Sequence, residues 1–296
     1  MNITKRLRNL AAAAAFLIAG GAVCPAAEFC GKPLLDHFYK AAAARETPAA
    51  ELKAISDGNL RALQERLAPL SAEEKSLVRK IAANPPYKVH RLKFQYLPTV
   101  LELGKLLSRA EAEELELVAK PLHTPAREDR LFGAYNCVFV AVGSPLGRDA
   151  YGDVVVYLKD GVDYGGWATP WSGYYFLGRN KFKLLLDKPA AFTRGVYQEQ
   201  GWPRAYALMA VSALRAMPEQ NRRNVLYRLL GESRSGLWEM FDSERLGYLE
   251  AKYDRHVSLE QVRMIYVPDG QYAEVLRWPQ AQRWRAIIAP AGAMPQ

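Results

Sequence analysis

Residues that bind metals are scarce in this sequence. Its 296 residues include only four histidines and three cysteines. The histidines are far apart along the chain, and no Cys/His spacing is that of a zinc site. Walker-type phosphate loops and the GxGxxG fingerprint are also missing, and the stretch WSG lacks the flanking glycine of a hydrolase nucleophile elbow. We therefore expect no bound metal, no P-loop enzyme and no serine hydrolase of the elbow type.

Long apolar runs are absent after the N-terminus, so we expect no transmembrane segment in the mature chain. At the N-terminus, three basic residues precede the run LAAAAAFLIAGGAV, and the small residues CPAA follow it. This order predicts a signal peptide over residues 1–27, cleaved after Ala26 or Ala27, and hence a secreted or periplasmic protein. A lipoprotein anchored at Cys24 stays open, although Val23 stands where such a site normally has a small residue.

Two cysteines, Cys30 and Cys137, remain after the predicted leader is removed. In an exported protein they can form a disulfide, which would tie the N-terminal segment to the strand-like stretch NCVFVAV. The sequence gives no distance between them, so two unpaired buried thiols remain the alternative.

The net charge is +9, and it falls to +6 without the three basic residues of the leader. This mild excess is compatible with an anionic partner, such as a dinucleotide, a nucleic acid or a membrane surface, and it requires none of them. No lysine-rich tail occurs that would favour non-specific binding of DNA.

The mature chain divides into a helical part and a mixed part. Before the proline pair at 85–86, apolar residues recur at helical spacing, and Ser71 with Glu74 forms a capping-box pattern. After it, alternating stretches typical of strands (YKVHRLKF, NCVFVAVG, GDVVVYLKD, LGYLEAKYD and QVRMIYVP) are interspersed with helical ones. We predict an α+β protein with an N-terminal helical region (28–86), a main domain (87–280) and a C-terminal tail (281–296).

The stretch YKVHRLKFQYLPTVLELGKLLSRAE places His90 and Arg91 on a strand-like segment that leads at once into a helical pattern. It resembles the first strand and helix of the ADP-ribosyltransferase fold, where a histidine-bearing strand continues into a helix of the type Leu-Pro-x-Ile-Leu-x-x-Gly-Leu-Leu-Ser. Gly104 follows His90 at a spacing of fourteen residues, which matches that pattern. The sequence departs from it at Leu92 and Lys93, where the family often has threonine or serine.

A second stretch, GYLEAKYDRHVSLEQVRMIYV, resembles the strand that bears the catalytic glutamate in the histidine-tyrosine-glutamate branch of this fold. Glu250 stands at the place of that glutamate, and the resemblance as a whole spans Tyr87 to Pro268. On a strand, Glu250 and Lys252 share one face. Without the resemblance, a solvent-exposed Glu250 beside Lys252 is the simpler interpretation.

The resemblance implies an ADP-ribosyltransferase-like split β-sheet core and NAD as the substrate. It gives Glu250 the catalytic role of stabilising the oxocarbenium-like centre that forms as nicotinamide leaves the ribose. It makes His90 the residue that fixes the dinucleotide by a hydrogen bond. Arg91 would be the anchor instead in the rival arginine-serine-glutamate branch, for which only a lone Ser144 is found in place of a Ser-Thr-Ser strand.

An aromatic stretch, DGVDYGGWATPWSGYYFLGRNKF, offers a wall for the nicotinamide ring. Tyr174 and Tyr175 are candidates for stacking on the ring, Tyr151 is a further one, and Ser172 is a candidate donor to the nicotinamide amide. Tyrosine and tryptophan clusters also build hydrophobic cores, and that remains the alternative for each of them.

From these features we expect an exported, toxin- or effector-like mono-ADP-ribosyltransferase that cleaves NAD and transfers ADP-ribose to a protein or nucleic acid. Two alternatives stay open. The same cleft could use water as the acceptor, which would make the protein an NAD hydrolase. The fold could also serve a non-catalytic periplasmic or secreted binding protein, an interpretation favoured by the missing threonine after His90.

Overall fold

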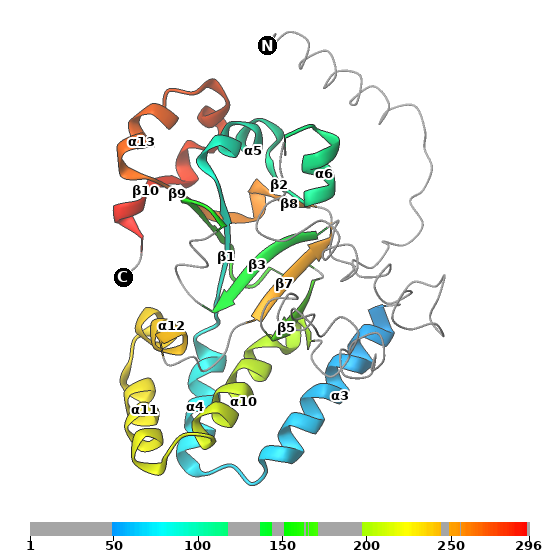
Figure 1. The fold of residues 1–296 in the computed structure, drawn as a ribbon, viewed down its shortest axis with the longest axis vertical. Coiled ribbons are helices and arrows are strands. Elements are labelled where there is room, and N and C mark those ends of the chain that lie inside the picture. The colour runs from blue at the N-terminus through cyan, green and yellow to red at the C-terminus, as the bar shows by residue number, and fades with distance from the viewer. Residues whose placement is uncertain are drawn as a thin grey trace, which may run out of the picture.

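The computed structural model describes residues 49–117, 137–143, 151–162, 164, 166–170, 197–243, 249–254 and 256–294. Within these ranges eight strands form one mixed sheet in the order β10-β9-β4-β1-β3-β7-β5-β6, with helices at both ends of it (Figure 1). This mixture confirms the predicted α+β class. The strands are β1 (Tyr87–Leu92), β3 (Cys137–Gly143), β4 (Val154–Leu158), β5 (Trp167–Pro170), β6 (Tyr197–Gln198), β7 (Leu249–Asp254), β9 (Val262–Val267) and β10 (Ile288–Pro290).

A group of helices lies at the end of the sheet where β1 begins (Figure 1). In this group α10 packs against α3 and α4, and α11 packs against α4 and α12. Apolar side chains of α3 and α4 belong to the same buried cluster as the valines of the sheet. Within the described chain, the helices that the sequence assigns to an N-terminal region thus share the core of the main domain. The group comprises α3 (Ala49–Leu67), α4 (Ala72–Ala83), α10 (Trp202–Arg215), α11 (Glu219–Gly231) and α12 (Arg234–Ser243).

Local sequence signals set the ends of the helices on both sides of β1. The Ser71 hydroxyl accepts a hydrogen bond from the Glu74 amide, and the Glu74 carboxylate accepts one from the Ser71 amide, so the predicted capping box starts α4. Helix α5 (Leu97–Leu103) ends at Gly104, whose φ of 66° is left-handed. A Cβ there would lie 3.1 Å from the Trp284 ring, so glycine satisfies both the cap and the packing.

The far end of the sheet carries α5, α6 (Arg109–Glu114) and α13 (Asp269–Val275) (Figure 1). Beside them β2 (Lys105–Leu107) pairs with β8 (His256–Ser258) in a separate antiparallel ladder. The residues assigned to a C-terminal tail belong to this part of the fold. Trp284 donates from Nε1 to the Leu101 carbonyl oxygen at 2.8 Å, and β10 adds a parallel edge strand to β9.

The ladder between β1 and β3 is short. It runs only from Tyr87 to Val89, whereas β1 stays paired with β4 from Val89 to Leu92. Among the described strands, the last three residues of β1 therefore pair only with β4. The sheet opens at this point between β1 with its neighbours β4 and β9, and β3 with its neighbours β7 and β5.

Candidate functional site

The strand register decides which predicted site residues share a face of the sheet. Val89 pairs with Ala141, and Ala141 pairs with Glu250. Paired residues point to the same side and neighbours along a strand alternate, so Arg91 shares the face of Glu250 while His90 points to the other face. We call the face that carries Val89, Arg91, Ala141, Glu250 and Lys252 the glutamate face. His90 and Glu250, to which the resemblance gives roles in one site, therefore lie on opposite faces of the sheet.

Glu250 lies in a buried ion pair on the glutamate face. The Lys252 Nζ is 3.0 Å from the Glu250 Oε1, and it also donates to the Glu250 main-chain oxygen at 2.9 Å. The side chain of Glu250 is 6% exposed and that of Lys252 is fully buried. This burial excludes the simpler interpretation of a solvent-exposed glutamate. The lysine offsets the cost of burying the charged carboxylate.

Arg91 lies at the edge of the opening in the sheet. Its guanidinium donates to the Gly152 carbonyl oxygen at 2.7 Å, and the side chain is partly buried. That hydrogen bond brings Arg91 to the segment that carries Tyr151, whose residue surface is 40% exposed. The described chain thus brings together two predicted ligand-binding residues, Arg91 and Tyr151, at the end of β1.

His90 occupies the place where the ladder between β1 and β3 is interrupted. Its Nδ1 lies 2.8 Å from the Phe139 carbonyl oxygen. A carbonyl only accepts, so Nδ1 carries the proton, and Nε2 is the acceptor of the neutral ring. Burial lowers the pKa of His90 from its ordinary value, and the hydrogen bond to Phe139 offsets only part of this shift. Because the net shift is downward, the ring is neutral at pH 7. The histidine therefore bridges two diverging strands.

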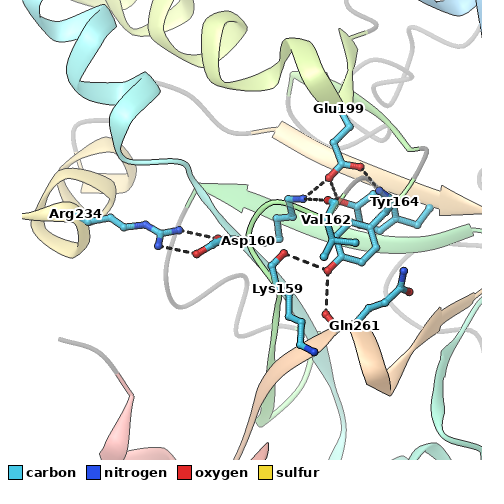
Figure 2. Close-up of polar contacts among 9 residues, drawn as sticks. Lys159, Asp160, Val162, Tyr164, Glu199, Arg234 and Gln261 are labelled. Carbon is cyan, nitrogen blue, oxygen red and sulfur yellow. Dashed lines mark hydrogen bonds and ion pairs between the residues drawn. The ribbon is translucent and has the colours of Figure 1, made fainter.

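A polar cluster that the sequence analysis did not identify lies on the face opposite Glu250. The Glu199 carboxylate accepts hydrogen bonds from the Lys88 ammonium, from the Tyr164 amide at 2.7 Å and from the Tyr253 hydroxyl at 3.4 Å (Figure 2). The ammonium also donates to the Val162 carbonyl oxygen and lies 4.5 Å from the centre of the Tyr164 ring. We call this group the Glu199 cluster. It ties β1 and β7 to the residues that precede α10.

A second group outside the sequence predictions lies on the glutamate face of β1, β4 and β9. Arg234 binds both oxygens of Asp160, at 2.8 and 2.9 Å (Figure 2). Its guanidinium also stacks 4.5 Å from the centre of the Tyr87 ring. Tyr87 and Tyr266 flank Tyr157 at 5.5 and 5.3 Å between ring centres. Desolvation raises the pKa of Tyr157 above its usual range. These rings build core, as aromatic clusters commonly do.

Several predictions fall on residues that the structure does not describe. Ser172, Tyr174 and Tyr175 lie outside the described ranges, as do the signal peptide and Cys30. Cys137 is buried at the start of β3, and its predicted pairing with Cys30 stays a prediction.

In the described part of the chain, no three His, Cys, Asp or Glu side chains gather as a metal site would require. None of its helices has both the length and the apolar character needed to span a bilayer.

No model of a known protein family matches the chain, and no curated protein matches it.

Proposed function

We propose that the protein is an exported ADP-ribosyltransferase that cleaves NAD and transfers ADP-ribose to a macromolecule. The order of strands and helices from Tyr87 to Pro268 supports this proposal, together with the opening of the sheet beside β1. The observation that carries it is the common face of Arg91 and Glu250. In the order of the sheet, the strands that carry these two residues are separated only by β3.

In the proposed reaction the bond between the ribose C1′ and the nicotinamide nitrogen breaks, and its electron pair leaves with nicotinamide. The Glu250 carboxylate stabilises the positive charge that develops on the ribose. The acceptor's nucleophile then bonds to C1′ and releases its proton. A carboxylate held in a low-dielectric site is suited to this role, since electrostatic stabilisation is stronger there than in water.

Arg91 is the better candidate for anchoring the dinucleotide on this face. A guanidinium binds phosphate oxygens through two parallel hydrogen bonds, and the Arg91 guanidinium contacts Gly152, the residue that follows Tyr151. The assignment favours the arginine branch of the resemblance for this position. His90 lies on the other face of the sheet and bridges β1 and β3, so we assign it no contact with the dinucleotide.

One observation favours a second candidate function, a non-catalytic binding protein on the same fold. Glu250 is paired with a buried lysine, and buried ion pairs also occur as purely structural features. In that case the chain would bind a ligand without breaking the ribose–nicotinamide bond.

The test uses the mature full-length chain and NAD labelled in its adenylate part. Samples contain no acceptor, a mixture of proteins, or a mixture of nucleic acids, and three products are measured: nicotinamide, free ADP-ribose and labelled macromolecule. We expect nicotinamide release with labelling of one class of macromolecule. Free ADP-ribose alone would identify an NAD hydrolase. No nicotinamide in any sample would refute the proposal, and NAD binding without turnover would then support the binding protein.

A further inference from the structure

Lys252 is placed to control the carboxylate on which the proposed reaction depends. We infer that Lys252 is a positioning residue, which fixes the direction of the Glu250 carboxylate towards the ribose; this inference rests on the proposed function. From the sequence alone, Lys252 is only a neighbour of Glu250 on the same face of a strand. The structure adds that the lysine is fully buried and contacts the glutamate twice.

The two contacts come from one ammonium group and reach one residue. Nζ of Lys252 lies 3.0 Å from the Oε1 and 2.9 Å from the main-chain oxygen of Glu250. The main-chain oxygen is fixed by the sheet, because β7 is paired with β3 on one side and β5 on the other. The ammonium therefore links the carboxylate to the backbone of a strand that is paired on both sides. Side chains held on such an element are placed more precisely than side chains on loops.

The surroundings of Lys252 hold its own side chain in place. Its Nζ lies 5.1 Å from the centre of the Trp167 ring and 5.9 Å from that of Phe139. Both residues pair with Lys252 across the neighbouring strands, so the rings stand beside the ammonium on the glutamate face. Aromatic faces attract a cation, and the attraction is larger where water is excluded. The lysine is therefore confined by the same sheet that carries the glutamate.

A positioning role differs from a structural one in what its loss changes. Loss of a structural ion pair lowers stability and leaves the chemistry of the folded molecules intact. Loss of a positioning contact lowers kcat in molecules that are still folded, and a misplacement of about 1 Å reduces rates by about 100-fold. KM for NAD should change little, because the proposed anchor is Arg91 on another strand.

The experiment compares Lys252→Met, Lys252→Arg and Lys88→Met in nicotinamide release from NAD. Lys88→Met is the matched control, because it breaks another buried lysine–glutamate pair on the opposite face of the sheet. Rates are measured at a temperature where circular dichroism shows all variants folded. We expect Lys252→Met to lower kcat by about 100-fold at unchanged KM, Lys252→Arg to recover part of it, and Lys88→Met to stay within about 3-fold of the parent.

A second measurement tests the coupling without relying on activity. Urea unfolding of Lys252→Met, Glu250→Gln and the double variant forms a double-mutant cycle. We expect Glu250→Gln to shift the unfolding midpoint much less in the Lys252→Met background than in the parent. Additive shifts would overturn the pairing on which the inference rests.

The possible failures are distinguishable. An active parent chain with an unchanged kcat in Lys252→Met would overturn the positioning role and leave the proposed function standing. A parent chain that releases no nicotinamide would refute the proposed function, and with it any role of Lys252 in that reaction.

Discussion

Replacement of Glu199 by glutamine removes the centre of the Glu199 cluster. The side chains of Lys88 and Glu199 are 11% and 7% exposed, and removal of one partner from a buried ion pair costs about 3–5 kcal/mol of unfolding free energy. The Val162 carbonyl and the Tyr164 ring still contact the ammonium in the variant. These remaining contacts place the expected loss near the lower end, about 3 kcal/mol.

Urea unfolding followed by circular dichroism measures this loss, with Glu260→Gln as the control. Glu260 pairs with Arg283, but both side chains are about 70% exposed, so its replacement should change stability by less than about 0.5 kcal/mol. A double variant, Lys88→Met with Glu199→Leu, should be more stable than Glu199→Gln, because it leaves no unpaired buried charge. Equal and small losses for Glu199→Gln and Glu260→Gln would show that the pair of Lys88 and Glu199 contributes no more to stability than an exposed ion pair.

Further predictions concern a helix end, acid stability and a core tryptophan. Gly104→Ala should lower the unfolding free energy by about 1–2 kcal/mol in urea melts, since alanine is strained at the φ of 66°. Lowering the pH below 6.5, the ordinary pKa of His90, should progressively reduce stability, because burial lowers the pKa of His90 and the unfolded chain takes up the proton first. His90→Asn should remove this part of the pH dependence of thermal unfolding, and a dependence identical to the parent would contradict it. The Arg215 guanidinium lowers the pKa of Glu74 from 4.5, so Glu74→Gln should flatten the further loss of stability below pH 4.5. Trp284→Phe should reduce the unfolding free energy by about 1 kcal/mol, because the hydrogen bond from the indole nitrogen to the Leu101 carbonyl oxygen is lost. An unchanged urea midpoint would count against that bond.

Local sequence signals predicted the elements that their own residues define. The capping box at Ser71 starts a helix, Gly104 ends one, and the alternating stretches around His90 and Glu250 are strands. The common face of Glu250 and Lys252 also followed from the two-residue period of a strand. In each case the information lies within a few residues of the element.

The choice between His90 and Arg91 needed information that no local stretch contains. A shift by one residue in the pairing of β1 with β3 would exchange the faces of His90 and Arg91 relative to Glu250. The partner of Lys88 was equally hidden, because Glu199 is 111 residues away along the chain. The three-residue strands β2 and β10 are too short to show a period, and their pairing with β8 and β9 is what defines them.

The catalytic role that we propose for Glu250 is to stabilise the charge that forms when the ribose–nicotinamide bond of NAD breaks. The most direct test is the rate of nicotinamide release by the parent chain, by Glu250→Gln and by the exposed control Glu260→Gln. We predict that Glu250→Gln lowers kcat by 100-fold or more, on the order of 3 kcal/mol in the barrier, while Glu260→Gln matches the parent. A folded Glu250→Gln variant that releases nicotinamide at the parent rate would contradict the claim.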